Sequence, residues 1–335
     1  MEIAECVPNV SEGKSRNKIS RMADTISACP GVSLLHVDSN PDANRTVFTF
    51  AGKLSDVTDA AYALFRTVTD EIDMTHQHGE HVRNGAMDVC PIIPVSDISM
   101  AECIAAAQAL GKRIGDTGVP VYLYGDAAVT FNRRELEQLR KGQYETLQHR
   151  LRQPEWQPDF GPTKWSETIA RTGSVQVGVR PFLVAWNVNL KTEDVHVAKK
   201  IARKIRTSGF RGIKGEFNFL KADGWRMPSY DCTQVTMNLT DYRHTGLHNV
   251  YERIRELANV SGTDVNGSEL IGLIPLDAIL TAGRWYAGAR DASLDENALI
   301  DLAVHNLGLD SLTPFIAENR IFEYRLAGAA HLRDD

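Results

Sequence analysis

The first half of the chain alternates short apolar runs with amphipathic stretches, as in proteins that mix strands and helices. The runs expected to form strands are residues 2–8, 32–37, 45–50, 87–95 and 119–124. Between them, apolar residues recur three or four positions apart, which indicates one buried side of a helix. These stripes are Ile19, Met22 and Ile26; Val57, Ala61, Leu64, Val68 and Ile72; and Cys103, Ala107, Leu110 and Ile114. The alternation predicts a sheet with helices on one face.

Local signals place several boundaries. The Pro, Asn and Asp residues at 38–44 predict a hairpin turn, with Asp38 and Arg45 at its turn end facing the same rim. Ser99 and Glu102 predict a capping box at a helix start. Near the end of the chain, a second capping box is expected at residues 293–296, and Gly308 is expected to end that helix.

The second half repeats the pattern. A strand is expected at 182–190, a hairpin with arms at about 216–220 and 233–239, and an apolar run at 270–275. Two helix stripes are Val195, Ala198, Ile201 and Ile205, and Leu247, Val250, Ile254 and Leu257. Residues 127–170 are expected to form a bridge with a charged helix at 133–152 and a proline-rich loop. We therefore expect an α/β protein of the α+β sandwich type, with similar subdomains at 1–178 and 179–335. Each is expected to be a mixed sheet with helices on one face, and a groove is expected between them.

Composition narrows the class of protein. The chain has 335 residues, 43% hydrophobic and 24% charged, which is enough for two ordinary cores. Its net charge of -6 gives no basic field for nucleic acid or an anionic membrane, and the basic residues at 199–206 are typical of a solvated helix face. No apolar run approaches the roughly 18 residues of a membrane span, and no signal peptide is expected. Five irregularly spaced cysteines favour reduced thiols in the cytoplasm.

The candidate chemistry concentrates in residues 73–88, where three of the ten histidines fall within six residues. Three interpretations compete. His76, His78 and His81 with Glu80 supply ligand types that suit a metal ion. Alternatively, His81 acts alone as a general acid and base, since imidazole titrates near neutrality. The third interpretation is a solvated polar loop without chemistry.

A second candidate lies at residues 7–13, a polar loop that leads into the first helix. Asn9 and Ser11 stand there at a helix entrance, where backbone donors favour anions and carboxylates. Simple N-terminal capping of the helix is the alternative.

Eight segments in order along nearly the whole chain resemble the glutamate formiminotransferase family. They include Gly79-Glu80-His81-x-Arg83-x-Gly85-Ala86-x-Asp88 and Pro158-Asp159-Phe160-Gly161-Pro162. The others are residues 5–13, 37–38 with 44–47, 73–74, 187–190, 238–241 and 267–273. No cyclodeaminase domain is expected in the chain.

The resemblance implies folate-dependent transfer of a formimino group from N-formimino-L-glutamate to N5 of tetrahydrofolate, with release of glutamate during histidine degradation. It implies two α/β subdomains, a homodimer, small-molecule substrates and no bound metal. His81 is the implied catalytic residue. We expect Asp38 or Glu80 to orient it or stabilise the amidinium charge, and Arg45 or Arg83 to pair with a glutamate carboxylate. The folate-binding residues implied are Asp159, Gly161, Thr163, Lys164, Trp165, Thr172, Gly173 and Ser174.

The sequence departs from the family pattern near both implied contacts. Val82 stands where the family usually has proline, Asn84 where a large apolar residue is expected, and Gly173-Ser174-Val175-Gln176 where the family has Gly-Ala-Thr. Because of these departures, a related formimino or formyl compound is an alternative donor substrate. Two further alternatives are a metal-dependent amidohydrolase that uses His76, His78 and His81, and a folate-binding homologue without catalysis.

Overall fold

The computed structural model describes residues 2–79 and 81–331, and the chain divides into two compact units, Met1–Pro181 and Phe182–Asp335. Each unit has its own sheet and its own hydrophobic core. The mixed α/β class expected from the sequence is confirmed.

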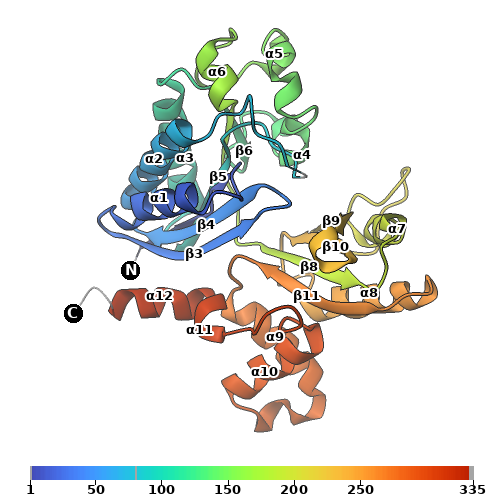
Figure 1. Cartoon of the computed structure of the whole chain (residues 1–335). Coiled ribbons are helices and arrows are strands. Elements are labelled where there is room, and N and C mark those ends of the chain that lie inside the picture. Colours follow the sequence, from blue (N-terminus) through green and yellow to red (C-terminus); the bar gives the residue numbers. More distant parts are fainter. Residues whose placement is uncertain (1, 80, 332–335) are drawn as a thin grey trace. The chain divides into compact units, whose positions relative to one another are not determined.

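The sheet of the first unit is mixed (Figure 1). Its strands are β1 (Ile3–Cys6), β2 (Asn9–Val10), β3 (Val32–Asn40), β4 (Arg45–Gly52), β5 (Met87–Ser96), β6 (Val121–Gly125) and β7 (Val175–Val179). β4 pairs antiparallel with β1, β2 and β3, and β5 pairs antiparallel with β1 and β2. β7 lies between β5 and β6 and is parallel to both. The sequence did not predict β7, because its five residues follow directly on the expected folate segment.

Three helices cover one face of this sheet: α1 (Arg16–Ser27), α2 (Leu54–Glu71) and α3 (Met100–Gly115). The three predicted stripes are buried, and they share one core with side chains of β1, β4, β5, β6 and β7 that point to the same face. The capping box at Ser99 and Glu102 is present, with the Ser99 hydroxyl accepting from the Glu102 amide.

The helix predicted at 133–152 is wrong. Between residues 131 and 172 the chain forms only short helical segments. They are Phe131–Arg133, α4 (Leu136–Leu139), Tyr144–Thr146, α5 (Leu147–Arg150), Pro154–Trp156 and α6 (Glu167–Thr172). Gly142 and Gln143 both have positive φ, 75° and 55°, which an α-helix does not accept. Tyr122 and Tyr124 of β6 point to this side and pack against Leu139, Leu147 and Leu151. The segment therefore covers the second face of β5 and β6.

The hairpin of β3 and β4 has the predicted turn, although β3 runs to Asn40 and pairs there with Arg45. Asp38 lies opposite Val47, and Val47 and Arg45 are two residues apart on one strand. Opposed residues and residues two apart share a face, so Asp38 and Arg45 lie on the same side of the hairpin.

The second unit has an antiparallel sheet in the order β11-β8-β10-β9, and not the mixed sheet expected for it. Its strands are β8 (Val184–Leu190), β9 (Leu220–Met227), β10 (Cys232–Leu239) and β11 (Val265–Ile271). The helices are α7 (Val195–Ile205), α8 (Leu247–Val260), α9 (Leu276–Ala287), α10 (Glu296–Leu307), α11 (Ala317–Arg320) and α12 (Phe322–His331). Val235, Met237 and Leu239 are buried on one face of β10, as their alternation predicted.

Two boundary predictions in this unit are wrong. The first hairpin arm is 220–227 rather than 216–220, because a short turn at Pro228–Tyr230 with Asp231 in the left-handed conformation closes the hairpin later. The N-cap of α10 is Asp295, whose side chain accepts from the Ala298 amide, and not Ser293. Gly308 ends that helix with a φ of 62°, as predicted.

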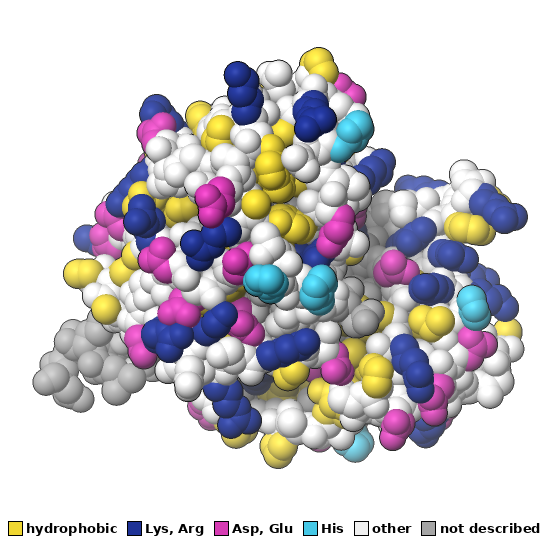
Figure 2. Space-filling model, turned by 45° about the horizontal axis from the view of Figure 1, so that its top comes forward, with side chains coloured by type: hydrophobic (Ala, Val, Ile, Leu, Met, Phe, Trp, Pro, Cys, Tyr) yellow, Lys and Arg dark blue, Asp and Glu magenta, His cyan; other side chains and the backbone are white. Residues whose placement is uncertain are grey.

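On the face shown in Figure 2, Lys and Arg side chains alternate with Asp and Glu, and no broad field of one sign forms. Among the described residues, no helix has the length and apolar character that a bilayer crossing requires.

Candidate active site in the first unit

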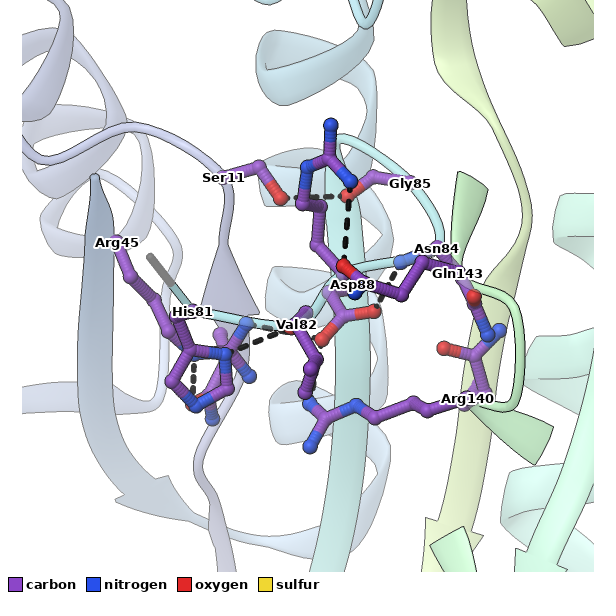
Figure 3. A network of polar contacts seen from close by, with 12 residues as sticks. Ser11, Arg45, His81, Val82, Asn84, Gly85, Asp88, Arg140 and Gln143 are labelled. Atoms are coloured by element: carbon purple, nitrogen blue, oxygen red, sulfur yellow. Dashed lines mark hydrogen bonds and ion pairs between the residues drawn. The ribbon is translucent and has the colours of Figure 1, made fainter. Parts of the chain in front are cut away.

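Polar side chains converge where β2, β4 and β5 come together. Arg45 is the first residue of β4, and Asp88 is the second residue of β5. Asn9 of β2 pairs with both neighbouring strands. The Arg45 guanidinium donates from Nε to Asn9 Oδ1 at 2.9 Å and from Nη1 to Asp88 Oδ2 at 2.9 Å (Figure 3). Two of the predicted substrate-binding residues, Asn9 and Arg45, are therefore in direct contact.

Asp88 is the centre of this cluster. It is fully buried and accepts from Arg45, from Arg140 Nη2 and from the Asn84 amide, the last at 2.8 Å. The Gln176 amide, with its nitrogen turned to Asp88, reaches Asp88 Oδ1 at 3.2 Å. Burial alone would raise the pKa of Asp88, but the Arg140 and Arg45 guanidiniums outweigh it and hold that pKa at about 2. Asp88 is thus a carboxylate at every physiological pH.

The cluster carries more positive than negative charge. Burial lowers the pKa of Arg45 to about 10 even though Asp88 acts in the opposite direction. Arg140 comes from the segment between β6 and β7, and its side chain is only 15% exposed. In the described part of the chain, Asp88 is the one carboxylate that forms an ion pair with either guanidinium.

His81 lies in the loop beside this cluster (Figure 3). Its Nδ1 stands 2.7 Å from the Val82 carbonyl oxygen. Because a carbonyl oxygen can only accept, Nδ1 carries the hydrogen in the neutral ring and Nε2 is the basic nitrogen. Burial, Arg45 and Arg140, in that order, lower the pKa of His81 well below its ordinary value, although the residue keeps part of its surface exposed. His81 is therefore a neutral base at pH 7.

The His81 loop is held from both sides by backbone contacts. Ser11 donates from Oγ to the Gly85 carbonyl at 2.7 Å and from its amide to the Ala86 carbonyl at 2.8 Å. On the other side, the Ala86 amide donates to the Thr172 carbonyl at 2.8 Å, and the Ser174 amide donates to the Asn84 carbonyl at 3.1 Å. Ser11, predicted to bind substrate, is 2% exposed and fixes the loop in this structure.

Arg83 is also engaged within the protein. It donates from Nε to Gln77 Oε1 at 2.8 Å, and it forms a two-pronged ion pair with Glu145 at 2.7 and 3.0 Å. Nη2 also donates to the Gln77 carbonyl. The side chain ties the His81 loop to the segment before α5, so all three guanidinium nitrogens already have partners.

The departure from the family pattern at Asn84 has a structural explanation. Its side chain is 1% exposed, donates to the Leu139 carbonyl at 2.8 Å and accepts from Arg150 Nη2 at 3.2 Å. The buried Arg150 also donates to the carbonyls of Leu139 and Gln143. An apolar side chain at 84 would leave part of this arrangement without partners.

The structure separates the predicted folate-binding residues into two groups. Thr172, Gly173 and Ser174 are buried directly against the His81 loop. Asp159 instead accepts from the Leu123 amide at 2.7 Å and from Arg133 Nη1 at 2.8 Å, which fastens its loop to β6. Gly161, with a φ of 87°, packs so closely on the Val119 carbonyl that only glycine fits.

Of the remaining predicted folate contacts, Thr163 and Lys164 are exposed, and Trp165 is partly buried with its ring 6.4 Å from that of Tyr144. A shallow hollow of about 300 Å³ lies between α2 and α6, where Arg171 and Thr172 line it. His81 and Arg45 do not line this hollow, so it is a separate depression from the cluster described above.

The remaining candidate site residues from the sequence are Asp38, Glu80, His76 and His78. Asp38 lies 4.0 Å from His36 Nε2. Glu80 lies outside the described residues. His76 and His78 are exposed, and no three His, Cys, Asp or Glu side chains of residues 2–79 and 81–331 are gathered as metal ligands would be.

Sequence reasoning missed Asp88, Arg140 and Gln176 as members of the cluster. Asp88 carried a usable signal, because a carboxylate in an otherwise apolar strand needs a buried partner. Arg140 carried none, since it was one of many charges in a stretch expected to be a solvated helix.

These observations define the class of protein. It is an α/β protein in two units, with a neutral imidazole next to two guanidiniums that pair with one carboxylate at the end of a sheet. The family profile for the formiminotransferase domain, N-terminal subdomain, matches residues 3–180, and that for the formiminotransferase domain matches residues 185–327. The chain therefore belongs to the formiminotransferase family, as the resemblance predicted.

Relatives of two kinds support this. The chain is 44% identical over 330 residues to "Formimidoyltransferase-cyclodeaminase" from Sus scrofa. The aligned region covers 96% of this chain and 60% of that protein. It is 38% identical to "Glutamate formimidoyltransferase" from Streptococcus pyogenes, over 87% of this chain and 95% of the relative. The protein of that name from Thermoplasma acidophilum is also 38% identical, over 85% and 92%. The chain thus spans about 60% of the longer relative and nearly all of the two shorter ones.

Proposed function

We propose that this protein transfers the formimino group of N-formimino-L-glutamate to N5 of tetrahydrofolate and releases glutamate, a step of histidine degradation. The support is that both subdomain profiles match and that relatives named glutamate formimidoyltransferase align over almost their whole length. The observation that carries the proposal is His81, whose ring is a neutral base beside a buried positive cluster.

The reaction needs one proton moved between two nitrogens. A bond forms from N5 of the folate to the amidine carbon, and the bond from that carbon to the glutamate nitrogen breaks. His81 Nε2 accepts the proton that N5 loses, and it then returns this proton to the leaving glutamate nitrogen. No proton or electron is left over, and tetrahydrofolate is a co-substrate that carries the group away.

The other residues have supporting roles. Arg45 binds a carboxylate of the donor. We favour it over Arg83 because all three guanidinium nitrogens of Arg83 have partners, whereas Arg45 bonds the described residues through Nε and Nη1 only. Asp38, on the same face of the hairpin as Arg45, or Glu80 orients the imidazole or stabilises the amidinium. Asn9 positions Arg45 through their 2.9 Å hydrogen bond, and Ser11 positions the loop.

Tetrahydrofolate binds along the segment that ends at Thr172, Gly173 and Ser174. The support is the backbone pairing of these residues with residues 84–86, which brings the segment next to the His81 loop. Thr163, Lys164 and Trp165 supply side chains earlier in the segment, while Asp159 and Gly161 hold its start against β6.

The departure at Val82 does not alter this chemistry. The group that fixes His81 is the Val82 backbone carbonyl, which a proline supplies equally well, and the Val82 side chain is 40% exposed. We therefore retain formiminoglutamate as the donor and treat a related formimino or formyl donor as the alternative.

The protein is further proposed to act in the cytoplasm as a homodimer on small molecules, without nucleic acid or membrane partners. All five cysteines are free thiols, and Cys6 and Cys90 stay unlinked with their sulfurs 3.7 Å apart, as suits a reducing compartment. Light scattering of the purified protein measures the dimer, and a monomer at assay concentrations would contradict it.

The central experiment is a donor screen with tetrahydrofolate that follows the substituted folate, together with His81→Ala. The variant should bind folate and lose turnover by about 100-fold or more, since general acid and base catalysis contributes roughly that much. Near-normal turnover of the variant would reject His81 as the base.

His76→Ala is the matched control in the same loop. It should keep turnover, whereas a metal-dependent amidohydrolase that uses His76 would lose activity in this variant and on chelation. Tight folate binding with no transfer from any donor would instead favour a binding protein without catalysis.

A further inference from the structure

We propose that Arg140, a residue of the segment between β6 and β7, acts with Arg45 as a binding site for a carboxylate of the donor substrate. This inference rests on the proposed function and adds a residue to it that the sequence gave no reason to select.

The cluster carries an excess of positive charge. Arg45 and Arg140 both pair with Asp88 Oδ2, so two guanidiniums share one oxygen of one carboxylate. Asp88 is fully buried and both arginine side chains are nearly so, at 8% and 15% exposed. A buried charge without a counter-ion is strongly unfavourable. The excess positive charge is therefore suited to an anion that arrives with the substrate.

Arg140 has unused hydrogen-bond donors. Its Nε is buried and has no hydrogen-bond partner among the described residues, where its side chain bonds through Nη2 alone. A guanidinium has five N–H donors, and buried donors are normally satisfied. Arg83, in the same region, has partners on all three nitrogens. Unlike Arg83, Arg140 therefore still has donors to offer.

Arg140 is held in place by the same contacts as the catalytic loop. Its backbone follows Leu139, whose carbonyl accepts from both Asn84 and Arg150. The backbone N–H of Asn84 in turn donates to Asp88 Oδ1. Arg140 is thereby positioned relative to His81 through residues 84 and 88, and a flexible surface arginine would not be.

The chemistry selects a carboxylate as the anion. A guanidinium offers two parallel N–H groups that match the two oxygens of a carboxylate, and such pairs are among the stronger hydrogen bonds in proteins. The proposed donor and its product, glutamate, each carry two carboxylates. One of them bound at Arg45 and Arg140 would place the rest of the molecule beside His81.

The test measures glutamate binding by calorimetry, separately from turnover. Arg140→Gln should weaken glutamate by about 10- to 100-fold, the range expected when a charge-assisted hydrogen bond is lost. Folate binding should change little. Arg140→Lys should recover part of the affinity, because it restores the charge but not the planar fork. In kinetics, the loss should appear in the KM for the donor more than in kcat.

Arg150→Gln is the matched control for a purely structural effect. Arg150 is buried in the same segment. Within residues 2–79 and 81–331 its Nε is also without a partner, but its other nitrogens bond only carbonyl and amide oxygens. This variant should lose stability without a selective loss of glutamate affinity. If Arg140→Gln behaves like Arg150→Gln, or binds glutamate as well as the unchanged protein, the inference is wrong.

A second readout is the pH profile. The described charged groups that face His81 are Arg45, Arg140 and Asp88. Removing Arg140 takes away one positive charge, so the acidic limb of kcat/KM should move to higher pH. A residue that only supports the fold would leave the limb in place.

The outcomes separate the two proposals. If the unchanged protein transfers the formimino group and Arg140→Gln leaves the donor KM and glutamate affinity intact, the inference fails and the function stands. If the unchanged protein transfers nothing but binds glutamate in an Arg140-dependent way, the function fails and the carboxylate site stands.

Discussion

Gly85 and Gly173 face each other in an antiparallel bridge between the His81 loop and the proposed folate segment. The approach leaves no room for side chains. A Cβ on Gly85 would lie 2.3 Å from the Ser174 carbonyl oxygen, and one on Gly173 would lie 2.5 Å from the Gly85 Cα. Two glycines therefore set the distance between the proposed base and the segment that binds its co-substrate.

The first prediction follows from this contact. Gly85→Ala should destabilise the protein by about 1–3 kcal/mol, because the added methyl group meets backbone atoms that cannot rotate away. Urea unfolding measures the loss. Gly328→Ala is the control, since a Cβ there meets nothing within 4 Å and the position is helical. Equal stability of the two variants would contradict the close packing at residue 85.

The second prediction concerns Asp88. Because its pKa is about 2, below the ordinary aspartate value of 3.8, its carboxylate stabilises the folded state above pH 4. This contribution is lost as the pH falls from about 4 to 2, when the folded protein must take up the proton. The shift corresponds to about 2 kcal/mol.

Asp88→Asn tests this directly. The variant should be less stable by about 3–5 kcal/mol at pH 7, because two guanidiniums then lose their buried counter-ion. Its stability should also change less than that of the unchanged protein between pH 4 and 2. Unfolding curves at several pH values measure both effects, and identical acid dependence of the two proteins would show that Asp88 is not the titrating group.

The sequence predicted the helices well and the site only in part. Stripes such as Val57, Ala61, Leu64 and Val68 identify a helix because burial of one face dictates them. The same reasoning failed at 133–152, where charges suggested a helix but Gly142 and Gln143 turn the chain. A residue-by-residue pattern does not contain the tertiary contacts that decide such a segment.

The same limit explains the site. His81 could be selected because histidines and glycines gather there in the sequence. Arg140 is 59 positions further along the chain, and its nearness to Asp88 arises only when the turns of that segment fold over β5 and β6. Strand β7 was missed for a similar reason, because it is identified by its place between β5 and β6 rather than by its five residues.

The third prediction is the pH dependence of transfer. Burial and the two guanidiniums lower the pKa of His81 well below the ordinary histidine value of 6.5. The imidazole is therefore still neutral at pH values where an ordinary histidine is already protonated. The acidic limb of kcat/KM, which reports protonation of the free enzyme's base, should therefore lie well below that of an ordinary histidine. Measuring kcat/KM from pH 4.5 to 8 locates it. A limb at or above about 6.5 would mean that another group, or a differently placed imidazole, acts as the base.

The last prediction uses the departure at Asn84. Asn84→Leu removes an acceptor from Arg150 and a donor from the Leu139 carbonyl, so it should cost about 1–3 kcal/mol. Arg150→Met should also destabilise, because the Leu139 and Gln143 carbonyls each lose one of their donors. Together the two changes replace a polar pair by an apolar one of similar volume. The double variant should be more stable than the sum of the single losses predicts, by about 1 kcal/mol.

A double-mutant cycle by urea unfolding measures this coupling. The control pair is Asn84→Leu with Arg134→Gln, since Arg134 belongs to the same segment but is exposed and bonds Asp126 instead. Those two changes should add without coupling. If the Asn84 and Arg150 changes also add independently, the polar residue at 84 is not explained by Arg150, and the reason for the departure lies with the substrate instead.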